Sequence, residues 1–243
     1  GHSQHICHCS DPTLFDEYTF ESLQAAIQPI RQAWVEGSAS AQEMETLLGF
    51  HYNDGVGCIW GEVAPIARIP ESIYWDSQHS VLASGGIAQY EANQFIRAVV
   101  GVGLTLDFIQ TFKDKIIMPS VWTRLRSFRF DQRVRSGEAQ PVRAFVGETM
   151  SLVVVLQFLA DWVLVPEGLL LEHVHCLKLL VAMVELFASG DAALQRLDML
   201  QGFIQAHQEL YARLYPGCLK PKLHYTAHVP RCMARFGKSL SCF

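Results

Sequence analysis

The stretch that decides the fold is RAFVGETMSLVVVLQFLADWVLV, residues 143–165, which Pro166 follows directly. Apolar residues occupy most of its circumference when it is drawn as a helix, and such a helix must be covered by its neighbours. Proline has no N–H to continue a helix, so the stretch is predicted to end at Val165. We therefore expect residues 143–165 to form the central helix of a bundle.

Helical patterns continue on both sides of this stretch. Downstream, apolar residues step by three and four positions over residues 170–184, and a further stripe over 191–214 ends at Pro216-Gly217. Upstream, residues 87–100 and 104–117 have helical spacing, and further helices are predicted over 19–36 and, as a short one, over 40–48. Three long helices that pack together are thus expected between residues 143 and 216, in a mainly α fold.

Composition limits the classes of function. The chain has 243 residues, of which 50% are hydrophobic and 18% charged, with a net charge of −5. These values suit a packed globular protein and argue against one that coats nucleic acid by bulk charge, while local basic patches remain open. The longest uncharged apolar run, residues 149–160, is shorter than the roughly 18 residues of a membrane span, so no membrane partner is expected.

The cysteines number seven and are scattered along a chain with enough apolar residues to fold without disulfides. No signal peptide is visible, so we expect a nuclear or cytoplasmic protein in a reducing compartment, not a secreted one. The sequence HICHC at residues 5–9 suggests zinc, but side chains so close together cannot all surround one tetrahedral ion. Two of them with distant ligands such as Cys58 would form a zinc site, and a solvated tail is the alternative.

A basic segment lies at residues 119–135 and carries arginine without lysine, interleaved with aromatic residues. Arginine and aromatic side chains together suit backbone phosphates and stacked bases. The candidate DNA-binding residues are Arg124, Arg126, Arg129 and Arg133. On one continuous helix Arg126, Arg129 and Arg133 would share a face, and Leu125 and Phe128 another, which is also the pattern of a solvated amphipathic helix.

The sequence IYWDSQH at residues 73–79 carries residue types used in metal chemistry. Asp76 directly follows an apolar, strand-like triplet, and His79 comes three positions later. A carboxylate at the end of a strand is well placed to bind Mg²⁺ in phosphoryl transfer. The alternative is an Asp that caps a helix, with a surface histidine beside it.

A second motif is KPKLHYTAHVPR at residues 220–231, followed by RFG at 235–237. His224 and His228 are four positions apart, so they share a helix face and would be able to chelate a metal ion. The surrounding cations suggest instead a basic helix with packed histidines. We expect His224 and His228 to be structural, and Lys220, Lys222 and Arg231 to contact DNA.

These two motifs together resemble conserved regions of eukaryotic DDE-type transposases and their domesticated relatives, with the CACTA (En/Spm-like) and related groups closest. Residues 220–237 are similar to the C-terminal stretch of these enzymes. The sequence DSQH at residues 76–79 is similar to a D-x-x-H signature between their second catalytic Asp and the catalytic Glu. The resemblance covers roughly residues 74–243, with motif detail only at its two ends.

The resemblance implies an RNase H-like core that a long helical insertion interrupts. We expect a mainly α fold, a helical insertion bundle with a small RNase H-like (α/β) remnant. The expected divisions are a polar His/Cys-rich tail at 1–18, a core remnant with short helices and an irregular segment at 19–86, the helical insertion at 87–216, and the return to the core at 217–243.

The resemblance also implies that the full-length protein, from a mobile element, binds DNA and performs Mg²⁺-dependent strand cleavage and transfer. Asp76 would be a catalytic residue and Mg²⁺ ligand, supported by His79. The family's catalytic Glu is expected beyond Phe243, so we expect a fragment that is inactive alone and holds Mg²⁺ no more tightly than a surface site. The alternatives are a non-enzymatic helical scaffold derived from a transposon, or a zinc-dependent binding module.

Overall fold

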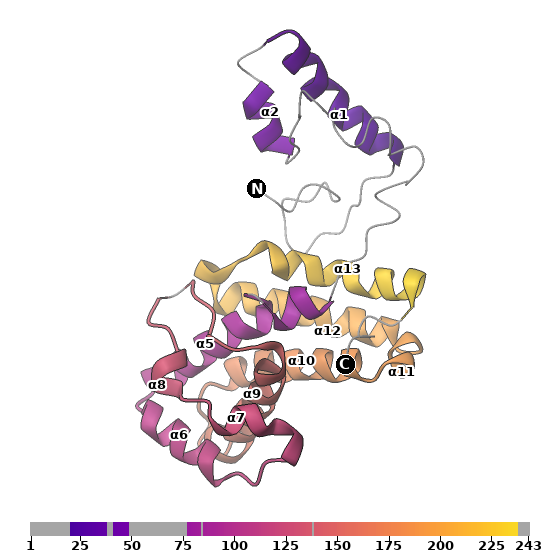
Figure 1. Cartoon of the computed structure of the whole chain (residues 1–243). Coiled ribbons are helices and arrows are strands. Elements are labelled where there is room, and N and C mark those ends of the chain that lie inside the picture. The colour runs from indigo at the N-terminus through magenta and orange to yellow at the C-terminus, as the bar shows by residue number, and fades with distance from the viewer. Residues whose placement is uncertain (1–19, 38–40, 49–76, 84, 138, 238–243) are drawn as a thin grey trace. The chain divides into compact units, whose positions relative to one another are not determined.

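The computed structural model describes residues 20–37, 41–48, 77–83, 85–137 and 139–237. Two compact units divide between Tyr74 and Trp75. The described residues are mainly helical and include no strand (Figure 1), so the mainly α prediction is confirmed. The strand-like triplet at 73–75, most of the irregular segment and the 1–18 tail lie outside the described residues. The predicted domain boundaries at 86 and 216 stay predictions.

The described part of the first unit is a pair of packed helices, α1 (Phe20–Val35) and α2 (Ala41–Leu48). Ile30 of α1 is buried, and so are Ala41 and Glu45 of α2. The indole N–H of Trp34 donates to Oε1 of Glu45 at 2.9 Å. This bond ties the C-terminal end of α1 to α2, since the Glu45 carboxylate gains a partner where water is largely excluded.

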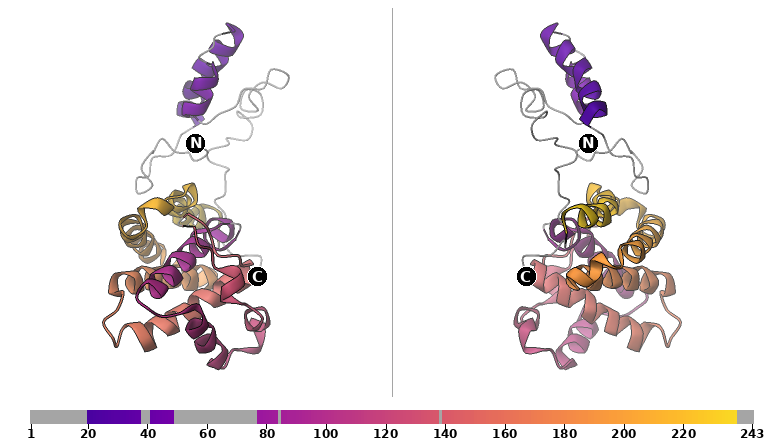
Figure 2. Two further views of the ribbon diagram at one scale, coloured as in Figure 1. Left: turned by 90° about the vertical axis from the view of Figure 1, so that its left-hand side faces the viewer. Right: turned by 90° about the vertical axis from the view of Figure 1, so that its right-hand side faces the viewer.

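The second unit is a bundle of helices of different lengths. In chain order its elements are η1 (Gln78–Leu82), α5 (Ile87–Gly101), α6 (Leu106–Lys115), η2 (Ser120–Trp122), α7 (Thr123–Arg126), α8 (Phe130–Arg133), α9 (Val146–Leu159), η3 (Ala160–Leu164), α10 (Leu171–Ala188), α11 (Asp191–Leu194), α12 (Leu197–Leu214), η4 (Pro216–Cys218) and α13 (Pro221–Phe236). Figure 2 shows from two sides how the long helices stack upon one another.

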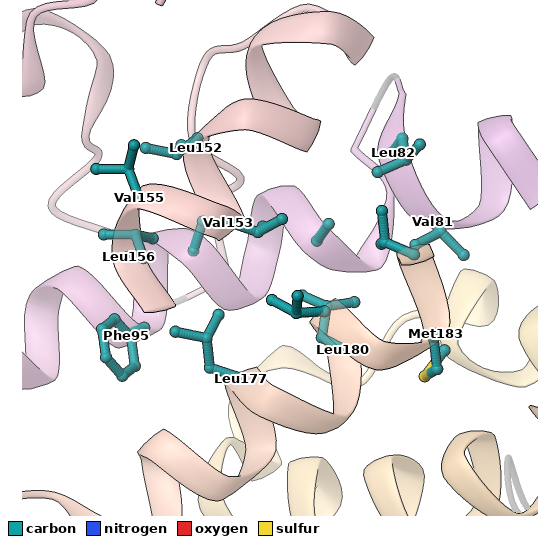
Figure 3. Packing of buried hydrophobic residues seen from close by; sticks show 14 of the residues in the cluster. Val81, Leu82, Phe95, Leu152, Val153, Val155, Leu156, Leu177, Leu180 and Met183 are labelled. Atoms are coloured by element: carbon teal, nitrogen blue, oxygen red, sulfur yellow. The ribbon is translucent and has the colours of Figure 1, made fainter. Parts of the chain in front are cut away.

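Helix α9 is central, as the sequence predicts. It contacts α5, α6, α7, α10 and η1, because apolar side chains on every face need a partner. In Figure 3, Leu152 and Leu156 of α9 lie in one cluster with Phe95 of α5 and with Leu177 and Leu180 of α10. The three long helices predicted between 143 and 216 are α9 with η3, α10, and α12, and α10 packs against both of the others.

Residues Val146–Leu164 are also long and apolar enough to cross a membrane. Half of this stretch's most apolar window, 50%, is buried against the rest of the protein. At its start, the Glu148 carboxylate is buried and accepts a hydrogen bond from the backbone N–H of Phe145 at 2.8 Å. Burial of this kind is typical of a core helix, whose apolar side chains contact other helices instead of lipid.

Replacing Leu156 with Ala tests the central position of α9. Leu156 has no exposed surface, so Leu156→Ala leaves a cavity and should lower the free energy of unfolding by about 2–5 kcal/mol in urea denaturation. Val165→Ala is the matched control, since Val165 is 40% exposed at the end of the same helical stretch and should cost about 0.5 kcal/mol or less. Equal effects of the two changes would show that α9 does not occupy the core.

Candidate functional site

Residues 124–133, here called the arginine segment, do not form the single amphipathic helix considered from the sequence. They form α7 and α8 with an extended break, in which Arg129 has φ −114° and ψ 116°. The side chains on either side of it, Phe128 and Phe130, are both fully buried and pack edge to face with centroids 5.3 Å apart. Two buried residues separated by one exposed residue require an extended backbone, which explains why the helix breaks here.

Exposed arginines alternate with buried apolar residues in this segment. Arg124, Arg126 and Arg129 are exposed, whereas Leu125 between the first two is 1% exposed and belongs to the main core cluster. Arg129 Nε lies 3.5 Å from Oδ1 of Asp131, and both side chains remain more than half exposed. Three of the four predicted arginines therefore present guanidinium groups to solvent from a backbone anchored in the core.

The fourth arginine, Arg133, is held within the protein. Its Nη1 donates to the backbone carbonyl of Arg143 at 3.1 Å, and its Nη2 lies 4.0 Å from Oε1 of Glu148. Its guanidinium also lies over the Phe128 ring, 5.8 Å from the centroid. These contacts indicate that Arg133 links the segment to the start of α9, so it is a weaker candidate for contact with a phosphate.

A fully buried lysine organises the arginine segment from beneath. Nζ of Lys113, on α6, donates to the backbone carbonyls of Leu125 at 3.2 Å, Arg126 at 3.2 Å and Phe128 at 2.8 Å. It also pairs with Oδ1 of Asp114 at 3.0 Å. An ammonium group has three N–H donors, so the three carbonyls and the Asp114 carboxylate together use its full capacity. Lys113 therefore fixes the turn between α7 and α8 and, through it, the direction of the exposed arginines.

Two further polar residues of α6 complete this support. Gln110 accepts a hydrogen bond from the backbone N–H of Phe130 at 3.1 Å and donates to the Asp114 carboxylate at 3.0 Å. Partial burial favours the neutral form of Asp114, but the hydrogen bonds from Gln110 and Lys113 outweigh it and lower its pKa. Asp114 is thereby kept as the negative partner of the buried lysine.

A shallow hollow lies beside the segment. It has a volume of about 290 Å³ and is lined by Lys113, Asp114, Ile116, Ile117, Met118 and Arg126. Ile117 in this lining is 97% exposed, and Val121, four positions later, is 82% exposed. This surface combines the exposed Arg126 and the Asp114 carboxylate with apolar groups, so it can contact the apolar parts of sugars or bases beside a phosphate bound by Arg126.

The second predicted set of basic residues belongs largely to α13. Lys222 Nζ donates to the backbone carbonyl of Ala83 at 3.2 Å, and burial lowers the pKa of Lys222. Lys220 Nζ lies over the Tyr90 ring, 5.5 Å from its centroid. Of this set only Arg231 is classed as exposed. The two lysines therefore join the start of α13 to Ala83, which lies ahead of α5, and to Tyr90 of α5, a role the sequence does not predict.

The predicted catalytic pair is only partly described. Asp76 lies outside the described residues, whereas His79 is an exposed residue of η1. Helix α13 packs against η1, so the described end of the first motif, Gln78 and His79, lies beside the second motif. The arginine segment is elsewhere in the unit: in Figure 1, α6 and α7 lie at the bottom and α13 lies along the top.

The two histidines of α13 are both buried, and their Nε2 atoms are 2.9 Å apart. At this distance one imidazole nitrogen donates and the other accepts, so the pair shares a proton. Gln208 of α12 fixes the same helix by donating to the backbone carbonyl of Leu223 at 2.6 Å and to the Thr226 hydroxyl at 3.0 Å. The structural role of His224 and His228 stays a prediction.

A second candidate site, which the sequence does not predict, is a polar cluster here called the buried centre. It consists of Glu91 on α5, Cys176 on α10 and His207 on α12, all fully buried, with one ligand-type atom from each within 4.8 Å of the others. His207 Nε2 lies 2.6 Å from Oε2 of Glu91. The signal available in the sequence is His207 itself, a polar residue on the apolar stripe between Ile204 and Tyr211.

The buried centre is not arranged for nucleophilic catalysis. Burial, followed by the negative charge of Glu91 and a hydrogen bond to it, raises the pKa of the Cys176 thiol far above its usual range. A catalytic cysteine needs the opposite shift and access to substrate. Burial and the charge of Glu91 also raise the pKa values of Tyr211 and Tyr215. A carboxylate, a thiol and an imidazole held this close together are the donor types that bind metal ions.

Removing the buried ammonium tests how the arginine segment is held. Lys113→Met keeps most of the side-chain volume but leaves three backbone carbonyls without their donor, which should lower the free energy of unfolding by roughly 3 kcal/mol. Trypsin should also cleave faster after Arg124 and Arg126 in the native protein. Lys115→Met is the matched control, because Lys115 is an exposed residue of the same helix. Unchanged cleavage in Lys113→Met would mean that the lysine does not hold the segment.

No protein-family model, curated protein or solved structure matches the chain. The two motifs at residues 76–79 and 220–237 therefore carry the resemblance to DDE-type transposases by themselves.

Proposed function

We propose that the chain is part of a eukaryotic DDE transposase-like protein and that its second unit binds DNA through the arginine segment. In this proposal the complete protein cleaves and transfers DNA strands with Mg²⁺. Asp76 binds the metal ion, and His79 supports it. Water, and then a 3′-hydroxyl, attacks phosphorus in line between two metal ions. The helical unit holds the DNA against this centre.

The observation that carries DNA binding is the rigid display of Arg124, Arg126 and Arg129. Their backbone is fixed by the buried Leu125 and by the Lys113 ammonium, so little order has to be gained when they meet a ligand. Guanidinium groups form paired hydrogen bonds with phosphate oxygens. A local group of fixed arginines on a protein of net charge −5 favours a defined contact over binding by bulk charge.

The transposase resemblance is supported by the closeness of the two ends of the helical part of the chain. A domain inserted into a core must leave and re-enter that core at neighbouring points. Lys222 and Ala83 are 139 positions apart in sequence, yet their Nζ and backbone carbonyl are 3.2 Å apart. The residues described between them form helices. This arrangement is the one that a helical insertion between the two motifs requires, and the RNase H-like remnant remains part of the proposal.

DNA binding can be measured by fluorescence anisotropy with a labelled duplex at increasing salt. We expect weak binding that falls steeply from about 50 to 200 mM salt, because phosphate contacts release counterions. The double variant Arg124→Ala/Arg126→Ala removes two phosphate contacts, so the slope of log K against log salt should become shallower by about 2.

The matched control is Arg196→Ala/Arg213→Ala, which removes the same charge from the residue before α12 and from its last turn. This control should leave the salt slope near that of the unmodified protein. Absence of binding at low salt, or equal slopes for the two double variants, would remove the arginine segment as the DNA contact.

A further inference from the structure

The buried centre contains polar atoms that its own hydrogen bonds leave unpaired. Within the described part of the chain, Oε1 of Glu91, Nδ1 of His207 and the hydroxyl of Tyr215 are buried without a hydrogen-bond partner. The ring of Tyr211 connects these groups, with its centroid 5.6 Å from that of His207 and 5.1 Å from that of Tyr215. Buried polar atoms normally have partners, so several unpaired ones in connected positions indicate a ligand.

We propose that Glu91, Cys176 and His207 bind a zinc-type divalent metal ion between α5, α10 and α12. A thiolate sulfur, an imidazole nitrogen and a carboxylate oxygen are the donors that Zn²⁺ and Co²⁺ use. Mg²⁺ and Ca²⁺ select oxygen ligands, so this site is different in kind from the one proposed at Asp76. Three protein ligands leave the fourth tetrahedral position to water.

Charge balance supports this choice of ion. The two positive charges of the ion are matched by the Cys176 thiolate and the Glu91 carboxylate, with His207 neutral, so the occupied site carries no net charge. A neutral site avoids the large cost of burying an isolated charge. Without an ion, burial and then the Glu91 carboxylate raise the pKa of the Cys176 thiol, whereas a coordinated metal ion removes the thiol proton outright.

The distances define what must move when the ion binds. Ligand atoms bonded to zinc at about 2.0–2.3 Å lie about 3.3–3.7 Å apart along the edges of a tetrahedron. The three ligand atoms lie within 4.8 Å of one another, which side-chain rotation can adjust. The 2.6 Å separation of His207 Nε2 and Glu91 Oε2 is instead a hydrogen bond. An ion held by the unpaired atoms, Nδ1 of His207 and Oε1 of Glu91, leaves that bond in place, whereas an ion held by Nε2 and Oε2 replaces the bond and its proton.

Binding releases protons to solvent. Cys176 loses its S–H proton when the sulfur bonds to the metal, and the proton between Nε2 and Oε2 is also released when both atoms become ligands. At least one proton therefore leaves for each ion bound, and affinity falls as the pH is lowered. Because the ligands come from three helices that meet in the core, the ion stabilises the folded unit.

The experiment adds Co²⁺ to the whole chain after treatment with a chelator. Cobalt bound to a thiolate gives a charge-transfer band in the near ultraviolet. We expect the part of this band that comes from the buried centre to saturate at one Co²⁺ ion per chain. The variant Cys7→Ser/Cys9→Ser removes the thiols of the N-terminal His/Cys cluster and should keep the band. Calorimetry of Zn²⁺ binding in two buffers of different ionisation enthalpy should show proton release.

The decisive comparison uses two buried cysteines. Both changes are made in the Cys7→Ser/Cys9→Ser background, where Cys176→Ser should abolish the band and the rise in unfolding temperature that Zn²⁺ produces. Cys232→Ser should retain both, since Cys232 is a buried thiol of α13 outside the cluster. If Cys176→Ser does not fold, Glu91→Gln serves instead and should weaken Co²⁺ binding at least tenfold while the band persists at saturation.

Three results would overturn the proposal. One is the absence of a thiolate band in the Cys7→Ser/Cys9→Ser protein. Another is a band that survives Cys176→Ser, and the third is Co²⁺ affinity unchanged by Glu91→Gln. None of these measurements involves DNA, so they succeed or fail independently of the proposed function.

Discussion

The need to cover α9 on every side governs the second unit. Its residues Leu152, Leu156 and Leu159 have no exposed surface, and apolar side chains on every face have to be removed from water. Helices α5 and α10 pack against it, and η2, α6 and α7 complete the cover. Because α7 turns Leu125 into the same cluster, the neighbouring arginines are forced outward. The surface proposed to bind DNA is thus the outer face of the elements that cover α9.

Two polar features within this apolar bundle have different consequences. Lys113 is fully buried and satisfied by backbone carbonyls, so it contributes order to the segment that it supports. The buried centre instead keeps unpaired atoms on Glu91 and His207. A satisfied buried charge is typical of a structural support, whereas an unsatisfied cluster of metal-ligand types is typical of a binding site. Whether the buried polar atoms have hydrogen-bond partners, rather than burial alone, distinguishes the two roles.

Helical periodicity was sufficient to predict the long helices, because α9, α10 and α12 depend mainly on apolar side chains at regular spacing. It failed for the arginine segment, where the core takes both Phe128 and Phe130 and a lysine from α6 binds the carbonyls. Local patterns do not contain such tertiary contacts. The same is true of Glu91 and His207, which are 116 positions apart. Asp76 lies outside the described residues, and its predicted role is unchanged.

The most direct measurement of the account's central claim is hydrogen–deuterium exchange of the whole chain with and without duplex DNA at low salt. The account predicts that DNA slows exchange at the backbone amides of η2, α7 and α8, which carry the exposed arginines, and leaves α11 and the start of α12 unchanged. A weaker change in α13 would agree with a contribution from Arg231. Bound DNA that leaves the exchange of residues 120–133 unaltered would contradict the account.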